Sequence, residues 1–540
     1  MTKAEQTFRM VWEDDIPVYA GVELNLEWKE VPWKKLENRI FKLQKRIYKA
    51  SSRGDVKAVR RLQKTLMRSW AAKCLAVRRV SQDNQGKKTA GVDGVKSLTP
   101  SQRIKLVNKI KLSQKAKPTR GVWIPKPGTE EKRPLGIPTI ADRAIQTLVK
   151  LALEPEWEAC FEPNSYGFRP GRSCHDAVVA IYNAISMKSK YVLDADIAKC
   201  FDRINQEALL EKLNTFPTLR RQIKAWLKAG VMDSKTLFPT SEGTPQGGVI
   251  SPLLANIALH GLENRIRQFA ESLPGRKRVN RENLSLIRYA DDFVVLHKEL
   301  AVVQRCQQII SEWLNGMGLE LKPSKTRITH TLQNHEGNLG FEFLGHNIRQ
   351  YMVGNYRADK DSQGRKLGFT TLITPSKEKV LLHLKEISRI IDTHKNAPQM
   401  ALITRLNPVI RGWANYYSTE VSKAVFSKLD HLTYQKLRAW AIRRCANSNK
   451  HEIADKYWHT VENDNWCFST QDGLKLTRHR DTPIERHIKV KGESSPYDGD
   501  WVYWCTRMGK HPETSNRMAK LLKTQNVDAP TADCSLNMTT

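Results

Sequence analysis

The sequence lacks the cysteine pairs and the long apolar runs that mark several common protein classes. Its nine cysteines are scattered singly among 540 residues, with no Cys-x-x-Cys pair, which argues against a zinc site and for reduced, intracellular thiols. No apolar stretch approaches the ~20 residues of a membrane-spanning helix. The Gly-rich segment 243–248 has no Gly-Lys-Ser/Thr, which excludes a phosphate-binding P-loop.

Acidic residues are also scarce. The chain has 56 Asp and Glu against 89 Lys and Arg, a formal net charge of +33. Such an excess predicts a polyanionic partner, nucleic acid rather than membrane, although a merely solvated cationic surface is the alternative. The first fifteen residues hold four acids and fit neither a secretory signal nor a transit peptide. We therefore expect a location in a bacterial-type cytoplasm.

Two adjacent carboxylates interrupt a stretch that otherwise favours β-strands. Asp291 and Asp292 lie within Leu286–Leu296, between two runs rich in apolar residues. Such runs predict a β-hairpin with both acids at its tip. An isolated Asp-Asp pair is usually an ordinary polar turn, but two anions on rigid strands repel each other unless a cation lies beside them. The predicted cation is Mg²⁺, which prefers carboxylate and phosphate oxygens.

A second apolar run also ends in acids. Tyr191–Leu193 precedes Asp194 and Asp196; on a strand these two share a face, so their spacing leaves open which one binds metal. If this strand meets the hairpin, three carboxylates can hold two metal ions about 4 Å apart, which activate a 3′-hydroxyl and stabilise the leaving pyrophosphate.

At this point the motifs resemble a known family. Tyr-Ala-Asp-Asp at 289–292, after Asp-Ala-Asp-Ile-Ala-Lys-Cys-Phe-Asp at 194–202, resembles the palm of a reverse transcriptase, in the form encoded by group II introns. Further blocks occur in the order typical of the family: Ile124–Lys126, Arg133–Pro138, Ser165–Arg169, Gly243–Gly248, Ser251–Asn256 and Phe343–Gly345. Any one block is weak evidence, but so many in order make a specific signal.

The resemblance implies an α/β right-hand polymerase fold with fingers and palm, an α-helical thumb (maturase domain X) and a small basic C-terminal domain. We expect an N-terminal helical, RNA-binding extension at 1–85, fingers and palm at 86–365, the thumb at 366–450, and a DNA-binding region at 451–540. In many relatives a zinc-supported HNH nuclease follows. The single Cys534 cannot form that site, so we expect this nuclease to be absent.

The resemblance also implies roles for individual residues. It selects Asp196 as the third catalytic and metal-binding carboxylate beside Asp291 and Asp292. Lys325 matches a lysine that the family keeps near the palm, without an assigned role.

Four further residues are expected to bind the incoming nucleotide. The resemblance implies that Lys126 and Arg133 grip the triphosphate and that Gln246 contacts the nucleotide. It also implies that Phe201 lies beneath the sugar, where its ring clashes with a 2′-hydroxyl. From the sequence alone, Lys126 is an ordinary solvated lysine and Phe201 a core residue, whereas the planar fork of Arg133 suits phosphate.

Helical periodicity appears at both ends of the chain. Near the N-terminus, Leu36, Ile40, Leu43 and Ile47, and then Val59, Leu62, Leu66 and Trp70, predict a helical hairpin with a break at 51–54. Its other face is basic and is either solvated or in contact with RNA; its members are Lys34, Lys35, Lys42, Lys45, Lys57, Arg60 and Arg61.

Beyond Gly345 a polar, Gly-containing stretch to Gly368 predicts a linker, after which helical patterns resume. The aromatics Trp413, Tyr416 and Tyr417 are expected in a core. Basic side chains nearby are candidates for phosphate contacts: Arg438, Arg443 and Arg444.

The predicted function is RNA-directed DNA synthesis with assistance to intron splicing and mobility. The expected partners are group II intron RNA, a DNA target and primer, and deoxynucleoside triphosphates, with Mg²⁺ as cofactor and no membrane. Two alternatives stand beside it: a host-adopted reverse transcriptase in DNA repair or defence, and a non-enzymatic RNA-binding splicing factor with a relic site, which the three Asp residues disfavour.

Overall fold

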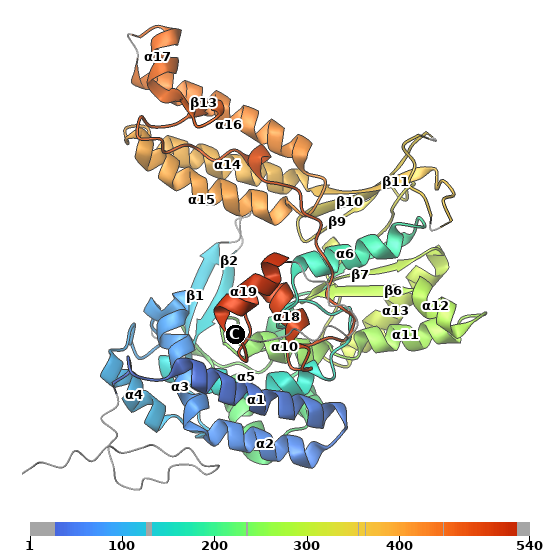
Figure 1. Ribbon diagram of the computed structural model, residues 1–540. Coiled ribbons are helices and arrows are strands. Elements are labelled where there is room, and N and C mark those ends of the chain that lie inside the picture. Colours follow the sequence, from blue (N-terminus) through green and yellow to red (C-terminus); the bar gives the residue numbers. More distant parts are fainter. Residues whose placement is uncertain are drawn as a thin grey trace, which may run out of the picture.

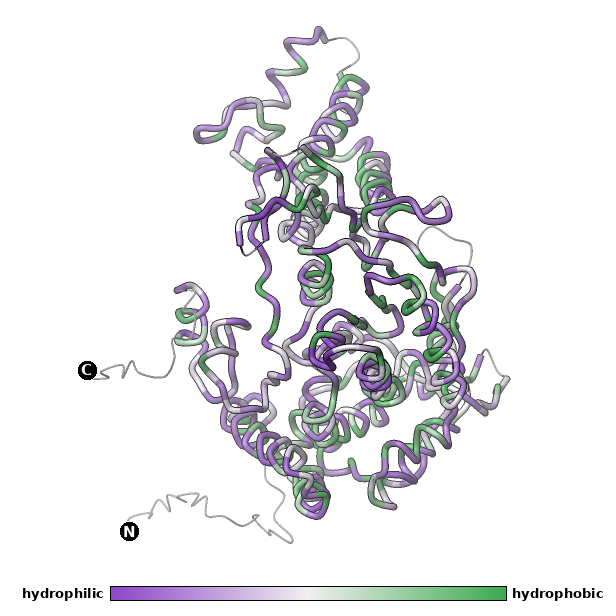
Figure 2. The backbone as a smooth tube through the Cα atoms, turned by 90° about the vertical axis from the view of Figure 1, so that its right-hand side faces the viewer, coloured by the Kyte–Doolittle hydropathy of each residue, from purple (hydrophilic) through white to green (hydrophobic). Residues whose placement is uncertain are grey.

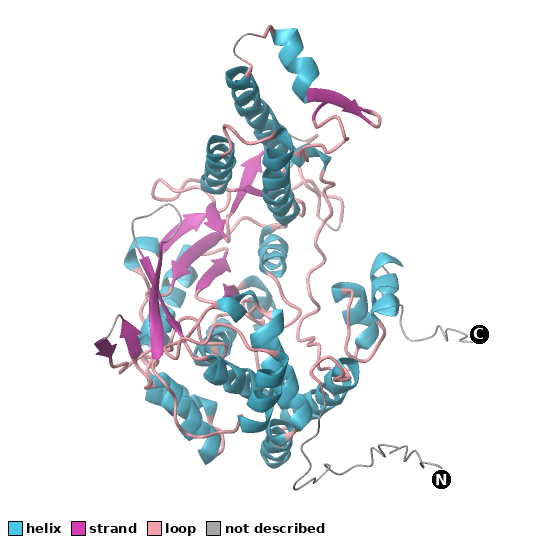
Figure 3. Ribbon diagram, turned by 90° about the vertical axis from the view of Figure 1, so that its left-hand side faces the viewer, coloured by secondary structure: helices cyan, strands magenta, loops and turns pink. Residues whose placement is uncertain are grey.

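A computed structural model describes residues 27–125, 132–233, 236–354, 356–361, 363–445 and 448–525. Helices and strands are mixed through much of the chain (Figure 1). Most strands lie at mid-height on the left of Figure 3, with helices above and below them, and a separate strand pair lies near the top. Apolar and polar residues are interspersed along most elements (Figure 2), as expected where one face is buried. No helix among these residues is long and apolar enough to cross a membrane.

The N-terminal helices form the predicted hairpin. The helices are α1 (Trp33–Ser52), α2 (Val56–Arg68), α3 (Trp70–Arg78) and α4 (Pro100–Lys109). Ile40, Ile47 and Leu66 are fully buried, in one core with Leu148 and Leu153 of α5 (Ile140–Glu158). The predicted period is confirmed for α1 and α2, since these apolar residues recur at three and four positions and line one face. The prediction is wrong for Trp70, which begins α3 and is exposed.

A first sheet has the strand order β2-β1-β4-β5. Its strands are β1 (Thr119–Pro125), β2 (Lys132–Ile137), β4 (Val231–Asp233) and β5 (Thr236–Phe238). β1 and β2 are antiparallel, with Ile124 opposite Arg133, so the two predicted strands are confirmed. The residues between them, including Lys126, lie outside the described residues.

The central sheet carries the acidic residues. Its strand order is β6-β7-β3-β8, all antiparallel neighbours; the strands are β3 (Tyr191–Asp196), β6 (Ser285–Tyr289), β7 (Asp292–His297) and β8 (Arg327–His330). Alternate residues enter two cores: Phe293 and Val295 face one, Val294 and Leu296 the other. Both faces are therefore covered, which explains why β7 is an unbroken apolar run.

Helices cover both faces of this sheet. The connecting helices are α6 (Cys174–Ile185), α7 (Cys200–Arg203), α8 (Gln206–Leu213), α9 (Pro217–Leu227), α10 (Ser251–Leu259), α11 (Leu262–Ser272), α12 (Lys277–Asn283) and α13 (Leu300–Asn315). α6 contributes Val178 and Ile181 to one core, and α13 contributes Val303 and Ile310 to the other.

The predicted linker from Gly345 to Gly368 is wrong in its first part, whereas the described residues at 353–368 contain no named helix or strand. This region includes β10 (His346–Met352), which pairs with β9 (Phe341–Phe343) and with β11 (Phe369–Pro375). Alternate residues of β10 are buried, among them Ile348 and Gln350. The strand pattern is hidden in the sequence because buried positions are filled by His346 and Gln350, which burial normally disfavours unless they are hydrogen-bonded.

A helical bundle follows the third sheet. It consists of α14 (Lys377–Thr393), α15 (Gln399–Tyr417) and α16 (Lys423–Arg444), extended by α17 (Lys450–Tyr457), β12 (Trp458–Val461) and β13 (Asp464–Phe468). The core of the bundle continues through Phe468, beyond residue 450, where the thumb was expected to end. The domain boundary at 450 stays a prediction. Tyr417 is buried, and Trp413 and Tyr416 pack against it, as expected.

The bundle is anchored to the third sheet by two tyrosines. The hydroxyl of Tyr416 donates to the carbonyl of Leu344 at 2.9 Å, and that of Tyr417 donates to the carbonyl of Gly345 at 3.1 Å. Because a buried hydroxyl needs a partner, these bonds fix where the bundle meets the Phe343–Gly345 block.

After the bundle the chain runs back to the N-terminal helices, where the described residues end in α18 (Trp501–Met508) and α19 (Asn516–Gln525) (Figure 1). Lys45 Nζ lies 2.6 Å from Glu513 Oε1, and Lys34 Nζ donates to the carbonyl of His511 at 3.1 Å. Part of the basic face of α1 is therefore used inside the protein and is not simply solvated.

Candidate active site

The acidic tip is a tight turn between β6 and β7. Tyr289 pairs with Asp292, so Ala290 and Asp291 form the turn. Ala290 has a φ of 57°, in the left-handed region that residues with a Cβ seldom adopt. Its carbonyl accepts a 3.0 Å hydrogen bond from Arg288 Nη1. Strained backbone of this kind persists only where neighbours hold it, and such positions cluster at functional sites.

The third carboxylate comes from β3, through the register of the central sheet. Asp196 pairs directly with Asp292 across the two antiparallel strands, and opposed residues of such a pair point to the same side. Burial, and then the charges of Asp291 and Asp196, raise the pKa of Asp292 to about 7. The three predicted carboxylates therefore meet at one edge of the sheet.

Asp194 is two residues earlier on the same strand and is engaged differently. Its Oδ2 accepts a 3.0 Å hydrogen bond from Arg327 Nε, and its strand partner is the apolar Val294. Burial raises the pKa of Asp194, against the charge of Arg327. The alternative that the sequence left open, Asp194 as the metal ligand, is disfavoured because Asp194 lies opposite Val294, whereas Asp196 lies opposite Asp292.

A lysine supplies positive charge at the acidic edge. Lys325 Nζ lies 2.7 Å from Asp196 Oδ2, and this hydrogen bond is the main cause that raises the pKa of Lys325. Its ammonium group thus places a positive charge in contact with one of the three acids, and the charges of the other two also raise its pKa.

The donor set fits a hard divalent cation, because it offers only carboxylate oxygens. Among the described residues, no group of three or more His, Cys, Asp or Glu side chains is arranged as a ready-made metal site. Mg²⁺ does not require one, since substrate phosphates and water normally complete its coordination. The geometry therefore suits an open site, completed by substrate, and not a closed cage.

A cavity of about 370 Å³ lies next to the segment that follows β3, and none of the three acids is among its lining residues; its volume is suited to a small molecule. Its walls come from β1, β2, α7 and the Gly-rich loop, and include Trp123, Gly136, Phe201, Asp202 and Gln246. The side chain of Phe201 is half-buried, so Phe201 is not a fully buried core residue. The structure thus brings Phe201 and Gln246 together at one cavity, whereas the side chain of Arg133, like Lys126, lies outside what is described.

Glycine is required in the loop that closes this cavity. A Cβ on Gly243, whose φ is +76°, would lie 2.5 Å from the backbone of Asp202. The next amide, Thr244 N, donates to the Phe201 carbonyl at 2.6 Å, and Gln246 Nε2 donates to Asp202 Oδ1 at 3.0 Å. The loop is therefore clamped onto the residues that follow β3.

A buried arginine beneath the turn joins three of the sequence blocks, and the sequence assigned it no role. Arg288 is 2% exposed; besides the Ala290 carbonyl it donates to Asn256 Oδ1 at 3.2 Å and to Ser165 Oγ at 2.7 Å. Asn256 Nδ2 in turn donates to the Gly167 carbonyl at 2.8 Å. The one available signal was a lone charge inside the apolar strand β6, because a buried charge needs partners.

Comparison with known proteins gives three matches to family models. Residues 28–110 match the N-terminal domain of reverse transcriptase, residues 124–348 match reverse transcriptase (RNA-dependent DNA polymerase), and residues 381–458 match the maturase-specific domain of group II introns. The three matches follow one another along the chain and include the acidic site and most of the bundle.

Curated relatives agree with these matches. The chain is 28% identical over 424 residues to the group II intron-encoded protein LtrA of Lactococcus lactis subsp. cremoris, covering 65% of this chain and 69% of that protein. It is 32% identical over 308 residues to protein YkfC of Escherichia coli K12, covering 50% and 78%. It is 28% identical over 416 residues to maturase-like protein 1 of Euglena gracilis, covering 74% and 78%.

Proposed function

The chain belongs to the reverse transcriptases encoded by group II introns, and from that premise we propose that Asp196, Asp291 and Asp292 are the catalytic carboxylates of its RNA-directed DNA polymerase. The observation that carries this proposal is the direct pairing of Asp196 with Asp292, beside the turn that holds Asp291. Carboxylates grouped in this way are suited to two-metal nucleotidyl transfer.

Reverse transcriptases depend on a divalent metal, and we propose that it is Mg²⁺ held by these three carboxylates. When bound, Mg²⁺ supplies activation of the primer 3′-hydroxyl and neutralisation of charge at the departing pyrophosphate. Lys325 orients Asp196 through its 2.7 Å contact. The turn at Ala290, held by Arg288, fixes the carboxylates before substrate arrives, so little reorganisation is needed in the reaction.

The cavity next to the segment that follows β3 is the proposed site of the incoming deoxynucleoside triphosphate. Phe201 and Gln246 line it, and Asp202 holds the amide of Gln246. We propose that the Phe201 ring lies against the sugar and that Lys126 and Arg133 neutralise the triphosphate, since the arginine fork matches phosphate geometry. RNA-directed polymerases of this family have the right-hand fold, in which the two sheets with their helices serve as fingers and palm.

The family also has a role in splicing, which we assign to the helical bundle as thumb and maturase domain, in contact with intron RNA. The proposed contacts are Arg438, Arg443 and Arg444, all exposed on α16. Arg444 has a second task, because its Nη1 donates to the carbonyl of Lys395 at 3.0 Å and its guanidinium lies over Trp440. We further propose that the C-terminal region contacts the DNA target.

We expect Phe201→Val to raise ribonucleotide incorporation relative to deoxynucleotide incorporation by about 10- to 100-fold, because it removes the ring that excludes a 2′-hydroxyl. The measurement is the ratio of kcat/KM values for the two triphosphates on a primed RNA template. Leu237→Val serves as control, because it shortens a different hydrophobic side chain, one that is exposed on β5. An unchanged ratio in Phe201→Val would return Phe201 to a purely structural role.

We expect Arg438→Gln with Arg443→Gln to weaken intron RNA binding and to lower the log-log salt slope by about one unit for each RNA phosphate that the variant no longer neutralises. Extension of a generic primed template should change much less, since neither side chain belongs to the acidic site. Arg444→Gln is measured separately, because its bond to Lys395 makes it partly structural. A salt slope equal to wild type in the double variant would remove α16 from the RNA-binding surface.

A further inference from the structure

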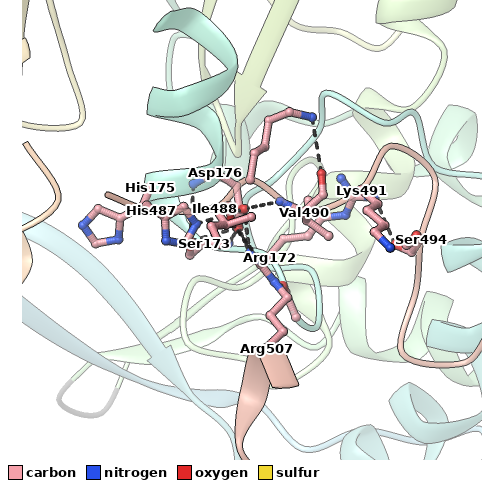
Figure 4. Close-up of polar contacts among 12 residues, drawn as sticks. Arg172, Ser173, His175, Asp176, His487, Ile488, Val490, Lys491, Ser494 and Arg507 are labelled. Carbon is pink, nitrogen blue, oxygen red and sulfur yellow. Dashed lines mark hydrogen bonds and ion pairs between the residues drawn. The ribbon is translucent and has the colours of Figure 1, made fainter. Parts of the chain in front are cut away.

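The chain returning from the helical bundle is held on the N-terminus of α6 by one buried carboxylate. Asp176 is fully buried and accepts hydrogen bonds from His487 Nε2 at 3.1 Å, Val490 N at 2.7 Å and Arg507 Nη2 at 2.6 Å (Figure 4). Arg507 also donates to the Ile488 carbonyl at 2.8 Å. We call residues 487–508 the C-terminal clasp.

The clasp also holds the loop just before α6. Arg172 Nη2 donates to the carbonyl of Gly492 at 2.8 Å, and Arg507 Nε donates to the carbonyl of Gly171 at 3.1 Å. Gly171 has a φ of +72°, and a Cβ there would lie 2.4 Å from the fully buried ring of Trp504. This end of the loop therefore fits the clasp so closely that only glycine is accommodated.

The other end of the same loop touches the acidic site. A Cβ on Gly167 would lie 2.4 Å from the amide nitrogen of Ala290 in the acidic turn. The next residue, Phe168, has a φ of 61° and a side chain that is 46% exposed. Its ring meets that of Phe201 edge-on, with centroids 6.2 Å apart and planes at 76°.

We propose that Phe168 is a positioning residue for Phe201 and that the C-terminal clasp fixes Phe168 through the loop 167–172. The proposal rests on the proposed role of Phe201 at the sugar. A non-glycine residue at positive φ with a half-exposed aromatic ring is unfavourable in itself, and such a conformation persists only where the surroundings determine it. Here Gly167 is fixed against the acidic turn, Arg169 by its ion pair with Glu158 and Gly171 against the clasp. The ring of Phe168 meets that of Phe201.

A steric block to the 2′-hydroxyl works only if its ring cannot move aside. An edge-on aromatic contact is a favourable geometry that restrains the partner ring. Phe168 therefore sets how sharply Phe201 discriminates between sugars without itself touching the nucleotide. The clasp lies more than 300 positions later in the chain and acts on the polymerase centre through Gly171, Phe168 and Phe201.

The test uses the full chain with three single substitutions, Phe168→Leu, Phe168→Tyr and Phe201→Val. A fourth variant combines Phe168→Leu with Phe201→Val. Phe168→Leu should raise the ribonucleotide to deoxynucleotide ratio of kcat/KM by about 3- to 10-fold, the size of one aromatic contact. The change should appear mainly in KM, with kcat for deoxynucleotide near wild type. Phe168→Tyr keeps the aromatic ring and should have the wild-type ratio. When Phe168→Leu is added to Phe201→Val, the ratio should not rise further.

The clasp is tested by Arg507→Met, with Arg517→Met as matched control, since Arg517 is an exposed arginine in α19 of the same C-terminal region. Arg507→Met should shift the sugar ratio in the same direction as Phe168→Leu, and Arg517→Met should not. If Phe168→Leu leaves the ratio unchanged, or adds fully to Phe201→Val, the proposal for Phe168 is overturned. If instead Phe201→Val has no effect while wild type extends primers, it is the proposed role of Phe201 that fails.

Discussion

Asp291→Ala is expected to lower primer extension on an RNA template by about 1,000-fold or more, equivalent to about 4 kcal/mol of transition-state stabilisation. Two metal ions that share carboxylates lose both position and affinity when one carboxylate is removed. Asp291 lies in the turn beside the paired Asp196 and Asp292, so no described neighbour in the turn replaces it. The measurement is single-turnover incorporation of one deoxynucleotide with Mg²⁺.

The matched control is Asp194→Asn on the same strand as Asp196. Asp194 is bound by Arg327, and its neutralisation should cost far less than that of Asp291. If the two variants lose activity equally, the assignment of the catalytic carboxylates is wrong. Wild-type-like extension by Asp291→Ala would have the same consequence, whereas a lack of extension by the unaltered protein would favour a non-enzymatic splicing factor with a relic site.

The same centre allows polymerisation and splicing to be separated. Asp292→Asn keeps the size of the side chain and should abolish extension, while intron binding and splicing stay near wild type, since splicing rests on basic surfaces that contact folded RNA. Both activities are measured on one preparation. Loss of both in a folded protein would contradict this division of labour.

The second large effect is on stability, at a buried ion pair. Arg169→Met is expected to destabilise the protein by about 3–5 kcal/mol, because it leaves Glu158 buried without its partner. Both side chains are 1% exposed, and Arg169 binds Glu158 through two hydrogen bonds of 2.9 Å. It also donates to the carbonyls of Glu162 and Ser165 at 2.8 and 2.9 Å, which then lose their donor.

The measurement is the Tm of the first unfolding transition, since a chain of several domains need not unfold in one step. Arg278→Met is the control, because it breaks an exposed pair with Glu282 and should leave Tm unchanged. Arg169→Met combined with Glu158→Leu should recover part of the loss, since the buried charge is then gone. A Tm for Arg169→Met equal to that of the control would contradict the argument.

Local patterns explain which parts of the fold were predictable. Apolar runs next to acids predicted β3, β6 and β7, and helical spacing predicted α1 and α2. Both patterns are visible because the periods of strands (2) and helices (3.6) involve only residues that are close together in the sequence. The strand β10 resembles a linker in the sequence because His346 and Gln350 fill buried positions. The burial of Gln350 is offset by hydrogen bonds, because Thr331 Oγ1 donates to its Oε1 at 2.6 Å and its amide donates to the Ile185 carbonyl at 2.8 Å.

Charges were the other limit of prediction from sequence. Lys45 resembles any solvated lysine in the sequence, yet it pairs with Glu513, and Asp176 resembles an ordinary helix-capping residue, yet it binds Arg507. The partner of each lies hundreds of positions away. No local pattern predicts such a pairing, since it depends on where the whole chain returns.

The sequence by itself determined the chemistry of this protein: three acids at the ends of apolar strands, a basic surplus suited to nucleic acid, and the order of the family's blocks. Only the tertiary structure decided which acids meet. The register that sets Asp196 opposite Asp292, the lysine at Asp196 and the clasp that reaches Phe168 through Gly171 all join residues far apart in the chain. The physical reason is that residue type and spacing fix local conformation, whereas the distance between two charges depends on how the sheets and helices pack.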